Sequence, residues 1–268
     1  MVAFPPCKIN IGLQILSRRQ DGFHTISTCF YPLPWTDVLE ILPAEQTQFI
    51  QSGNVIPGKN EDNLCLKAYH LLQTDFKIGP VKIHLHKIIP TGAGLGGGSS
   101  DAAYTIRMLN TVFDLKLSQK QMMDYASALG SDCSFFIQDS PMIGSGRGEV
   151  LDPVVLNLKG FYVVVIKPSI HVSTAEAYNG VTPMPLSATL NSLIGMPVDQ
   201  WKDRIKNDFE LSLFPKYPVI QQVKEKLYQL GALYASMSGS GSSVFGIFRN
   251  EIDSRMQFRD SFGWAGKL

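Results

Sequence analysis

The 268-residue chain carries 24 basic and 23 acidic side chains, a formal net charge of +1, and is 44% hydrophobic. Such a chain can bury a full core, and its length exceeds the ~100–200 residues common for one domain. The balanced charge supplies no global field for nucleic acid or an anionic membrane surface. No run approaches the ~20 apolar residues of a membrane span, and the first residues lack a signal peptide's apolar core. We therefore expect a cytoplasmic protein with neither nucleic acid nor membrane as a partner.

The first half of the chain predicts both strands and helices. Strands are expected over 24–33 and 37–42, and a helix over 63–75. Residues 81–88, VKIHLHKI, alternate apolar and polar side chains, which is typical of a half-buried strand in an antiparallel sheet. The cysteines show neither CxxC nor paired-histidine spacing, so we expect reduced thiols at Cys7, Cys29, Cys65 and Cys133.

A glycine-rich segment follows the strand at 81–88. Residues 90–103, PTGAGLGGGSSDAA, hold five glycines, and apolar residues then recur at helical spacing up to Phe113. A second helix is predicted by a capping box of Ser118 and Gln121 and by Gly130 at its end. The candidate N-caps of the first helix are Ser99, Ser100 and Asp101.

The second half of the chain begins after the turn-rich stretch GSGRGEVLDP, and we place a domain boundary near residue 152. This gives an N-terminal domain over 1–152 and a C-terminal domain over 153–268. In the second we expect a strand in GFYVVVIKPS, short helices around 174–180 and 187–206, a helix over about 218–230, and a strand, loop and strand over 233–248. The fold class is therefore α+β with two domains.

The glycine-rich segment has four possible uses. A P-loop needs lysine after its last glycine, where Gly98 stands instead. Gly92, Gly94 and Gly97 form a dinucleotide fingerprint, but the strand before them alternates and two helices follow. A mobile linker does not normally sit between a strand and an amphipathic helix. The fourth use, backbone N–H groups converging on phosphate oxygens at a helix start, requires no lysine in the loop.

The segment PTGAGLGGGSSDAA also resembles the central motif of the GHMP kinases (galactokinase, homoserine kinase, mevalonate kinase and phosphomevalonate kinase), whose usual form is P-x-x-x-G-L-G-S-S-A-A. It has the extra glycines of one branch, whose members phosphorylate a cytidine diphosphate-linked methylerythritol in the non-mevalonate isoprenoid pathway. PCKINIGL, DGFHTI, GSDCSFFI and SGSGSSVFG match that branch in order, between about residues 5 and 248. The resemblance implies the two-domain GHMP kinase fold, with the active site in the cleft between the domains.

The resemblance implies roles in catalysis for three residues. In phosphoryl transfer a carboxylate accepts or orients the proton of the acceptor hydroxyl. The family's base matches Asp132, and its lysine partner, which stabilises developing negative charge, matches Lys8. Asn10 matches a residue that hydrogen-bonds the substrate near the transfer site. From spacing alone, Asp132 could equally be a turn residue and Lys8 a solvated charge.

For the cytidine substrate, the resemblance assigns His24 to hydrogen bonding with cytosine and Phe23 to stacking on it. Phe23 departs from the usual tyrosine, which removes a hydroxyl but keeps the ring. Tyr178 matches the opposing aromatic residue in a variable segment. The alternative is that Phe23 belongs to the core and His24 is an ordinary strand residue.

For ATP, the resemblance implies that backbone groups of the glycine-rich segment bind the phosphates and that Asn63 and Lys87 line the adenine pocket; a helix cap and a solvated charge are their alternatives. Mg²⁺ is implied as well, held by the phosphates and a serine, Ser100, and the glutamate that is a metal ligand in many relatives is not matched in this sequence. The glycine loop Gly239, Ser240 and Gly241 is expected beside the acceptor and the triphosphate. The full ATP-binding set is Asn63, Lys87, Pro90, Gly92, Gly94, Leu95, Gly96, Gly97, Gly98, Ser99 and Ser100.

The sequence therefore predicts an ATP-dependent kinase, a monomer or homodimer, that phosphorylates the 2-hydroxyl of the cytidine diphosphate-linked methylerythritol by direct in-line transfer. Two alternatives stay open. Another GHMP kinase, of the homoserine or mevalonate type, would share the glycine-rich segment but lack DGFH. A non-catalytic sensor on the same fold is disfavoured by the presence of both Lys8 and Asp132.

Overall fold

The computed structural model describes residues 1–184, 188–253, 257–258 and 261–268. The chain forms two compact units that interleave along the sequence. Unit 1 comprises residues 1–7, 35–91 and 96–140, and unit 2 comprises residues 8–34, 92–95 and 141–268. A boundary near residue 152 between two consecutive sequence domains stays a prediction. Among the described residues, no helix has both the length and the apolar character that a bilayer crossing requires.

The sheet of unit 1 has the strand order β1-β4-β6-β5. Its strands are β1 (Val2–Ala3), β4 (Val38–Pro43), β5 (Gln48–Gly53) and β6 (Val81–Lys87). The alternation predicted for β6 is confirmed, because every second side chain from Val81 is buried. The expected antiparallel sheet is only half right: β6 runs antiparallel to β4 but parallel to β5. A helix connects β5 to β6, and such a crossover is what parallel pairing requires.

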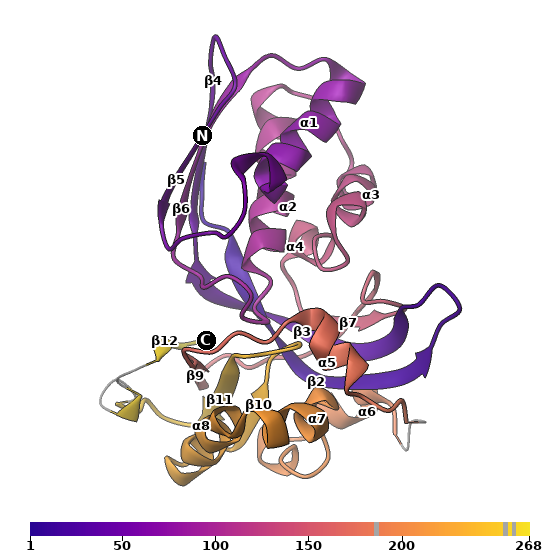
Figure 1. Ribbon diagram of the computed structural model, residues 1–268, viewed down its shortest axis with the longest axis vertical. Coiled ribbons are helices and arrows are strands. Elements are labelled where there is room, and N and C mark those ends of the chain that lie inside the picture. The colour runs from indigo at the N-terminus through magenta and orange to yellow at the C-terminus, as the bar shows by residue number, and fades with distance from the viewer. Residues whose placement is uncertain (185–187, 254–256, 259–260) are drawn as a thin grey trace. The chain divides into compact units, whose positions relative to one another are not determined.

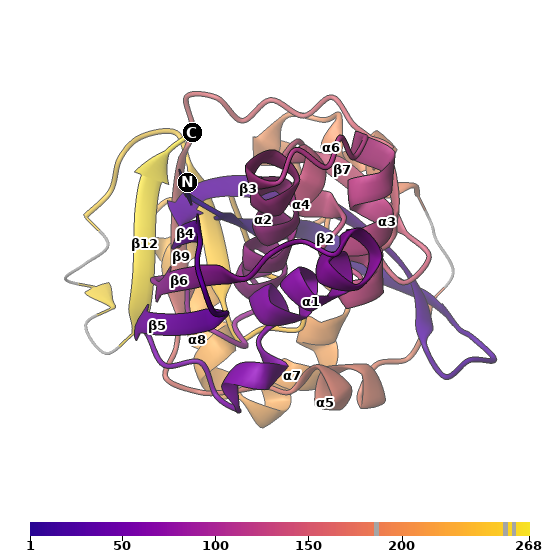
Figure 2. The same ribbon diagram turned by 90° about the horizontal axis from the view of Figure 1, so that it is seen from above.

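Four helices of unit 1 lie on one side of this sheet (Figures 1 and 2). They are α1 (Leu64–Phe76), which follows the 3-10 turn η1 (Asn60–Asp62), α2 (Gly97–Val112), α3 (Gln119–Leu129) and α4 (Phe135–Gln138). The capping box of α3 is confirmed, with Gly130 at its C-cap. The N-caps predicted for α2 are wrong. Gly96 occupies that position with φ of 69° and no side-chain cap, so the helix begins two residues earlier than Ser99.

Unit 2 contains two sheets, with orders β2-β3-β7-β8 and β10-β11-β9-β12. The first consists of β2 (Pro6–Arg18), β3 (His24–Thr36), β7 (Met142–Ser145) and β8 (Val150–Pro153), of which β2 and β3 begin or end in unit 1. The second consists of β9 (Tyr162–Lys167), β10 (Tyr234–Met237), β11 (Val244–Phe248) and β12 (Phe262–Lys267). The predicted strand, loop and strand over 233–248 is confirmed as β10 and β11, whereas β12 was not predicted.

Most helices of unit 2 are short, as the sequence predicts. α5 (Thr174–Asn179) and α8 (Pro218–Gln229) are confirmed, and α7 (Phe209–Lys216) was missed. The short helices expected around 187–206 are confirmed within the described residues as α6 (Leu190–Ile194) and the 3-10 turn η2 (Val198–Gln200), which Gly195 and Pro197 separate. Residue 187 lies outside the described residues. All four cysteines are buried, free thiols, as expected.

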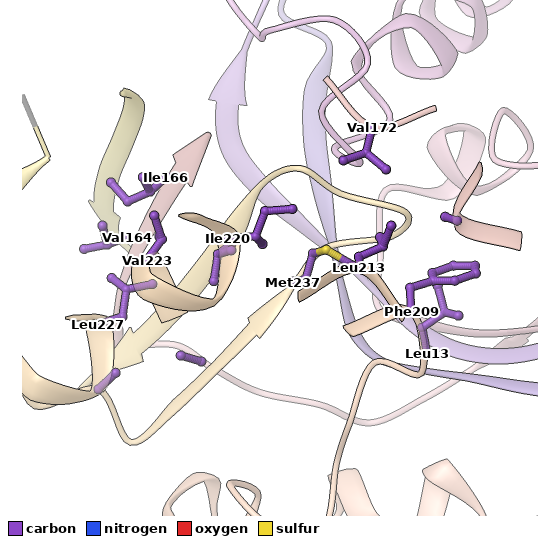
Figure 3. Packing of buried hydrophobic residues seen from close by; sticks show 14 of the residues in the cluster. Leu13, Val164, Ile166, Val172, Phe209, Leu213, Ile220, Val223, Leu227 and Met237 are labelled. Carbon is purple, nitrogen blue, oxygen red and sulfur yellow. The ribbon is translucent and has the colours of Figure 1, made fainter. Parts of the chain in front are cut away.

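A hydrophobic cluster holds these elements together. Figure 3 shows Ile220, Val223 and Leu227 of α8 beside Val164 and Ile166 of β9. These five side chains are at most 6% exposed. Burying an aliphatic side chain in this way stabilises the fold by roughly 1.5–3 kcal/mol, so α8 is fixed by packing rather than by its intrinsic propensity.

Ile220→Ala should destabilise the protein by about 2–5 kcal/mol, because it removes a fully buried side chain and leaves a cavity. The matched control is Val219→Ala, at a neighbouring position that is 37% exposed, which should cost less than about 1 kcal/mol. Equilibrium urea unfolding measures both. Equal losses in the two variants would contradict this account of the core.

Candidate active site

The glycine-rich loop between β6 and α2 is shaped by three left-handed residues. Gly92, Gly94 and Gly96 have φ of 61°, 76° and 69°, values that only glycine adopts without strain. A Cβ on Gly94 would overlap the carbonyl oxygen of Ser238. Ser238 Oγ also donates a hydrogen bond to Gly94 O at 2.9 Å. Within unit 2, residues 92–95 therefore lie directly against the second glycine loop.

Lys8 and Asn10 of β2 hold the same part of the loop. Lys8 Nζ donates to Asn10 Oδ1 at 2.5 Å and to Gly94 O at 3.3 Å, and the side chain is only 3% exposed. Its backbone N–H donates to the carbonyl of Leu95 at 2.9 Å. Asn10 Nδ2 donates to Thr28 Oγ1 at 2.9 Å. Lys8 is therefore a buried, hydrogen-bonded cation rather than the solvated charge of the alternative interpretation.

The start of α2, in unit 1, lies over a buried cluster of one lysine and two aspartates. Lys87 Nζ donates to Asp101 Oδ2 at 2.7 Å and, through a very short hydrogen bond, to Asp37 Oδ2. Asp37 Oδ1 accepts the backbone N–H groups of Ile88 and Ile89 at 2.6 and 2.8 Å. A Cβ on Gly97 would lie 2.9 Å from Lys87 Nζ. The cluster thus joins the end of β6 to the first turn of the helix.

Burial and charge act in opposite directions in this cluster. Burial raises the pKa of Asp101 to about 7, although the neighbouring Lys87 ammonium favours its ionised form. Burial also opposes the charge of Lys87, but the Asp101 and Asp37 carboxylates outweigh it and raise the pKa of the ammonium. The carboxylates therefore stabilise the protonated, charged form of Lys87, whereas burial destabilises the ionised form of Asp101.

A pocket of about 160 Å³ opens beside this cluster, smaller than the ~300–1,000 Å³ of sites that enclose a whole drug-sized ligand. Asn63 is both its wall and the cap of α1, accepting the N–H of Cys65 through Oδ1 at 2.9 Å. Its lining, all in unit 1, is Gln51, Ile56, Pro57, Gly58, Lys59, Asn60, Asp62, Asn63, Leu64, Lys87, Thr91, Gly98 and Asp101.

Two serines and an aspartate near the loop differ in accessibility. Ser100 has no exposed surface and its Oγ has no hydrogen-bond partner, whereas Ser99 is half-buried. This enclosure does not favour Ser100 as a metal ligand. Asp132, in unit 1, is half-buried in the turn between α3 and α4. No three His, Cys, Asp or Glu side chains among the described residues are grouped to hold a metal ion.

The residues expected to bind cytosine are partly brought together in unit 2. The rings of His24 and Tyr178 stack with centroids 5.0 Å apart, and Phe209 meets Tyr178 edge-on at 4.8 Å. Burial, helped by Arg18, lowers the pKa of His24. This favours a neutral imidazole that can donate and accept. Phe23 is 53% exposed, with the Arg147 guanidinium 5.0 Å from its ring centroid, so it is not a core residue.

Hydrogen bonds connect the site to residues for which the sequence analysis predicted no role or a different one. Ser238 links Asn10 to Gly94, and Asn207 Nδ2 donates to the carbonyl oxygens of Met237 and Gly239 at 2.8 Å each. No sequence signal pointed to Asn207. Asp101 carried a signal as part of the glycine-rich motif, but it was interpreted as a helix cap.

Comparisons with known proteins agree with this architecture. Residues 63–145 match the family model for the GHMP kinases N terminal domain, and residues 195–255 that for GHMP kinases C terminal. The 4-diphosphocytidyl-2-C-methyl-D-erythritol kinase of Cytophaga hutchinsonii is 52% identical over 95% of this chain and 94% of its own. That of Parabacteroides distasonis is 47% identical over the full length of both.

Solved structures give the same result. A crystal structure of 4-(cytidine 5'-diphospho)-2C-methyl-D-erythritol kinase has a TM-score of 0.86 and 31% identity, covering 99% of this chain and 98% of that one. The homoserine kinase of Cytophaga hutchinsonii and the mevalonate kinase of Methanococcus jannaschii are 16% and 15% identical, with TM-scores of 0.70 and 0.71, and share the fold. The relatives at 52% and 47% identity are kinases and the matched domains are those of the GHMP kinases, so the chain is an ATP-dependent kinase. Within the GHMP kinase superfamily, the chain belongs to the 4-diphosphocytidyl-2-C-methyl-D-erythritol kinase family.

Gly94→Ala should lower the free energy of unfolding by at least about 2 kcal/mol, because it combines a positive φ with overlap onto Ser238. Gly98→Ala is the control. Its Cβ would meet nothing closer than Leu64 Cδ1 at 4.0 Å, and stability should hold or rise slightly. Denaturant unfolding of both variants provides the comparison. A Gly94→Ala protein as stable as the Gly98→Ala protein would show that the loop is not constrained in this way.

Proposed function

We propose that this chain transfers the γ-phosphoryl group of ATP to the 2-hydroxyl of 4-diphosphocytidyl-2-C-methyl-D-erythritol, in the non-mevalonate route to isoprenoid precursors. The observation that carries the proposal is the match of 52% identity over 95% of the chain to a kinase named for this substrate. Buried free thiols support action in the cytoplasm. Both substrates are small molecules.

Asp132 is the catalytic base in this proposal. Its carboxylate accepts the proton of the acceptor hydroxyl, whose oxygen forms a bond to the γ-phosphorus as the bond to the β-phosphate oxygen breaks and ADP leaves. Lys8 supplies positive charge that stabilises the charge developing on the transferred group. The hydrogen bonds of Lys8 to Asn10 and Gly94 support this role, because they fix the ammonium before the substrate arrives.

The nucleotide is assigned to the glycine-rich loop and the pocket beside it. Backbone N–H groups of residues 94–99 and the positive end of α2 offer donors to the phosphates, whereas the N–H of Ser100, included in the expected set, donates to Gly96 O at 2.9 Å. The pocket lined by Asn63 and Lys87 takes the adenine. Leu95 and Pro90 are buried and hold the loop's shape rather than contact phosphate.

The family also implies Mg²⁺, which would neutralise phosphate charge when bound. The donor set is compatible with a weakly held ion, since Mg²⁺ keeps waters and uses substrate phosphates as ligands. The half-buried Ser99 hydroxyl is the more accessible protein ligand, and the enclosed Ser100 hydroxyl would need a rotation of the helix start.

The cytosine ring is assigned to the aromatic cluster of unit 2. His24 and Tyr178 already stack on each other, and a neutral imidazole can pair with the donors and acceptors of cytosine. Phe23 offers an exposed ring for stacking on the base. The loop of Gly239, Ser240 and Gly241, held by Asn207, is assigned to the acceptor and triphosphate.

Asp132→Asn and Lys8→Met should each lower kcat by at least about a hundredfold, because one removes the proton acceptor and the other the positive charge. Turnover is measured with purified 4-diphosphocytidyl-2-C-methyl-D-erythritol in a coupled ADP-release assay. Circular dichroism and urea unfolding check that each variant folds. Near-normal turnover in a folded Asp132→Asn protein would contradict the proposed role of Asp132 as the base. Faster turnover of homoserine or mevalonate by the wild-type protein would contradict the proposed substrate.

Tyr178→Leu should raise KM for the cytidine substrate roughly tenfold to a hundredfold while leaving KM for ATP unchanged, because base stacking contributes ~1–3 kcal/mol per base. Tyr178→Phe keeps the ring and serves as the matched control. Cytidine diphosphate should also inhibit the leucine variant more weakly than it inhibits the wild-type protein. Equal inhibition of the two proteins would show that the cytosine ring does not stack on Tyr178.

A further inference from the structure

The imidazole ring of His171 lies against the glycine-rich loop within unit 2. A Cβ on Gly92 would lie 3.0 Å from His171 Cε1 and 3.1 Å from His171 Nδ1. The side chain of His171 is exposed, although the next residue, Val172, is buried. An imidazole carries at least one ring N–H that can donate a hydrogen bond. A ligand that reaches this part of the loop can therefore also reach the donor.

Hydrogen bonds fix the backbone that carries His171. Lys167 Nζ donates to the carbonyl oxygens of Pro168 and Ile170, at 3.0 Å each. Ser242 Oγ, directly after the second glycine loop, donates to the same Ile170 carbonyl at 2.9 Å. Because the backbone is already held in place, a contact made by His171 loses less ordering entropy than one made by a free loop.

The segment that carries His171 also leads to the proposed cytosine site. Thr174 Oγ1 lies 3.3 Å from Ser240 Oγ of the second glycine loop. Tyr178, about one turn later in α5, stacks on His24. From His171 to Tyr178 the chain spans at most ~17 Å, for three extended and four helical steps. A nucleoside diphosphate with its base at Tyr178 can thus place its phosphates beside His171.

We propose that His171 donates a hydrogen bond to the diphosphate of the cytidine-linked substrate. The inference rests on the proposed function, in which the cytosine of that substrate binds at Tyr178. The triphosphate of ATP is the other phosphate group assigned to this loop. The course of the chain favours the diphosphate, because it runs from His171 directly to the ring assigned to the base. His171 thereby recognises the part of the substrate between its base and its acceptor hydroxyl.

His171→Ala should raise both KM for 4-diphosphocytidyl-2-C-methyl-D-erythritol and the inhibition constant of cytidine diphosphate at least about tenfold, because a hydrogen bond to a charged group is lost. KM for ATP should not change, and neither should inhibition by cytidine, which has no phosphate. The coupled ADP-release assay measures all four constants. The matched control is His70→Ala, which removes another exposed histidine, on α1 in unit 1, and should change none of them.

The exposure of His171 predicts that the alanine variant folds normally, which urea unfolding checks. Wild-type inhibition of this variant by cytidine diphosphate would overturn the inference. A rise confined to KM for ATP would place the histidine at the triphosphate, and weaker inhibition by cytidine would show a disturbed base site; either result also overturns it. The proposed function fails in a different way: cytidine diphosphate would then not inhibit even the wild-type protein.

Discussion

The contact between Gly94 and the Ser238 carbonyl is the constraint on which the rest of the phosphate-binding loop depends. The two backbones approach so closely that a Cβ cannot fit between them. Lys8 and Ser238 both donate hydrogen bonds to the Gly94 carbonyl. The absence of a side chain at Gly94 thus allows the close approach to Ser238, and the carbonyl held there is also an acceptor for the cation proposed for catalysis.

The second organising feature is the charge buried in unit 1. Moving Lys87 and two carboxylates out of water costs several kcal/mol per ion, and their attraction offsets this only because most of their hydrogen-bonding groups are paired. The cluster therefore contributes little net stability. It does fix the position of α2 relative to β6, because displacing either element would leave a buried charge unpaired. Its residues come from β6, α2 and the residue preceding β4.

Local signals accounted for the features predicted correctly from sequence. The capping box of α3 and the alternation of β6 depend on neighbours within four residues, and both are confirmed. The start of α2 was missed because a left-handed Gly96 replaces a side-chain cap. α7 was missed because it has no side-chain cap and contains Pro215. Family motifs located the site residues, but they did not reveal that Asp37, Lys87 and Asp101, 50 and 14 positions apart, form one cluster.

The interleaving of the two units governs the order in which the protein can assemble during translation. Unit 1 has all its segments once residue 140 has left the ribosome. β2 has its sheet neighbour β3 as soon as that strand is made, but β3 must wait for β7, because Cys29 pairs with Ile143. The middle of β2 must wait longer still for its second contact, because Leu13 bridges to Asn207. The earliest part of unit 2 to be synthesised is therefore among the last to complete its contacts. A nascent chain leaves Leu13 without this bridge until nearly four-fifths of the polypeptide has been made.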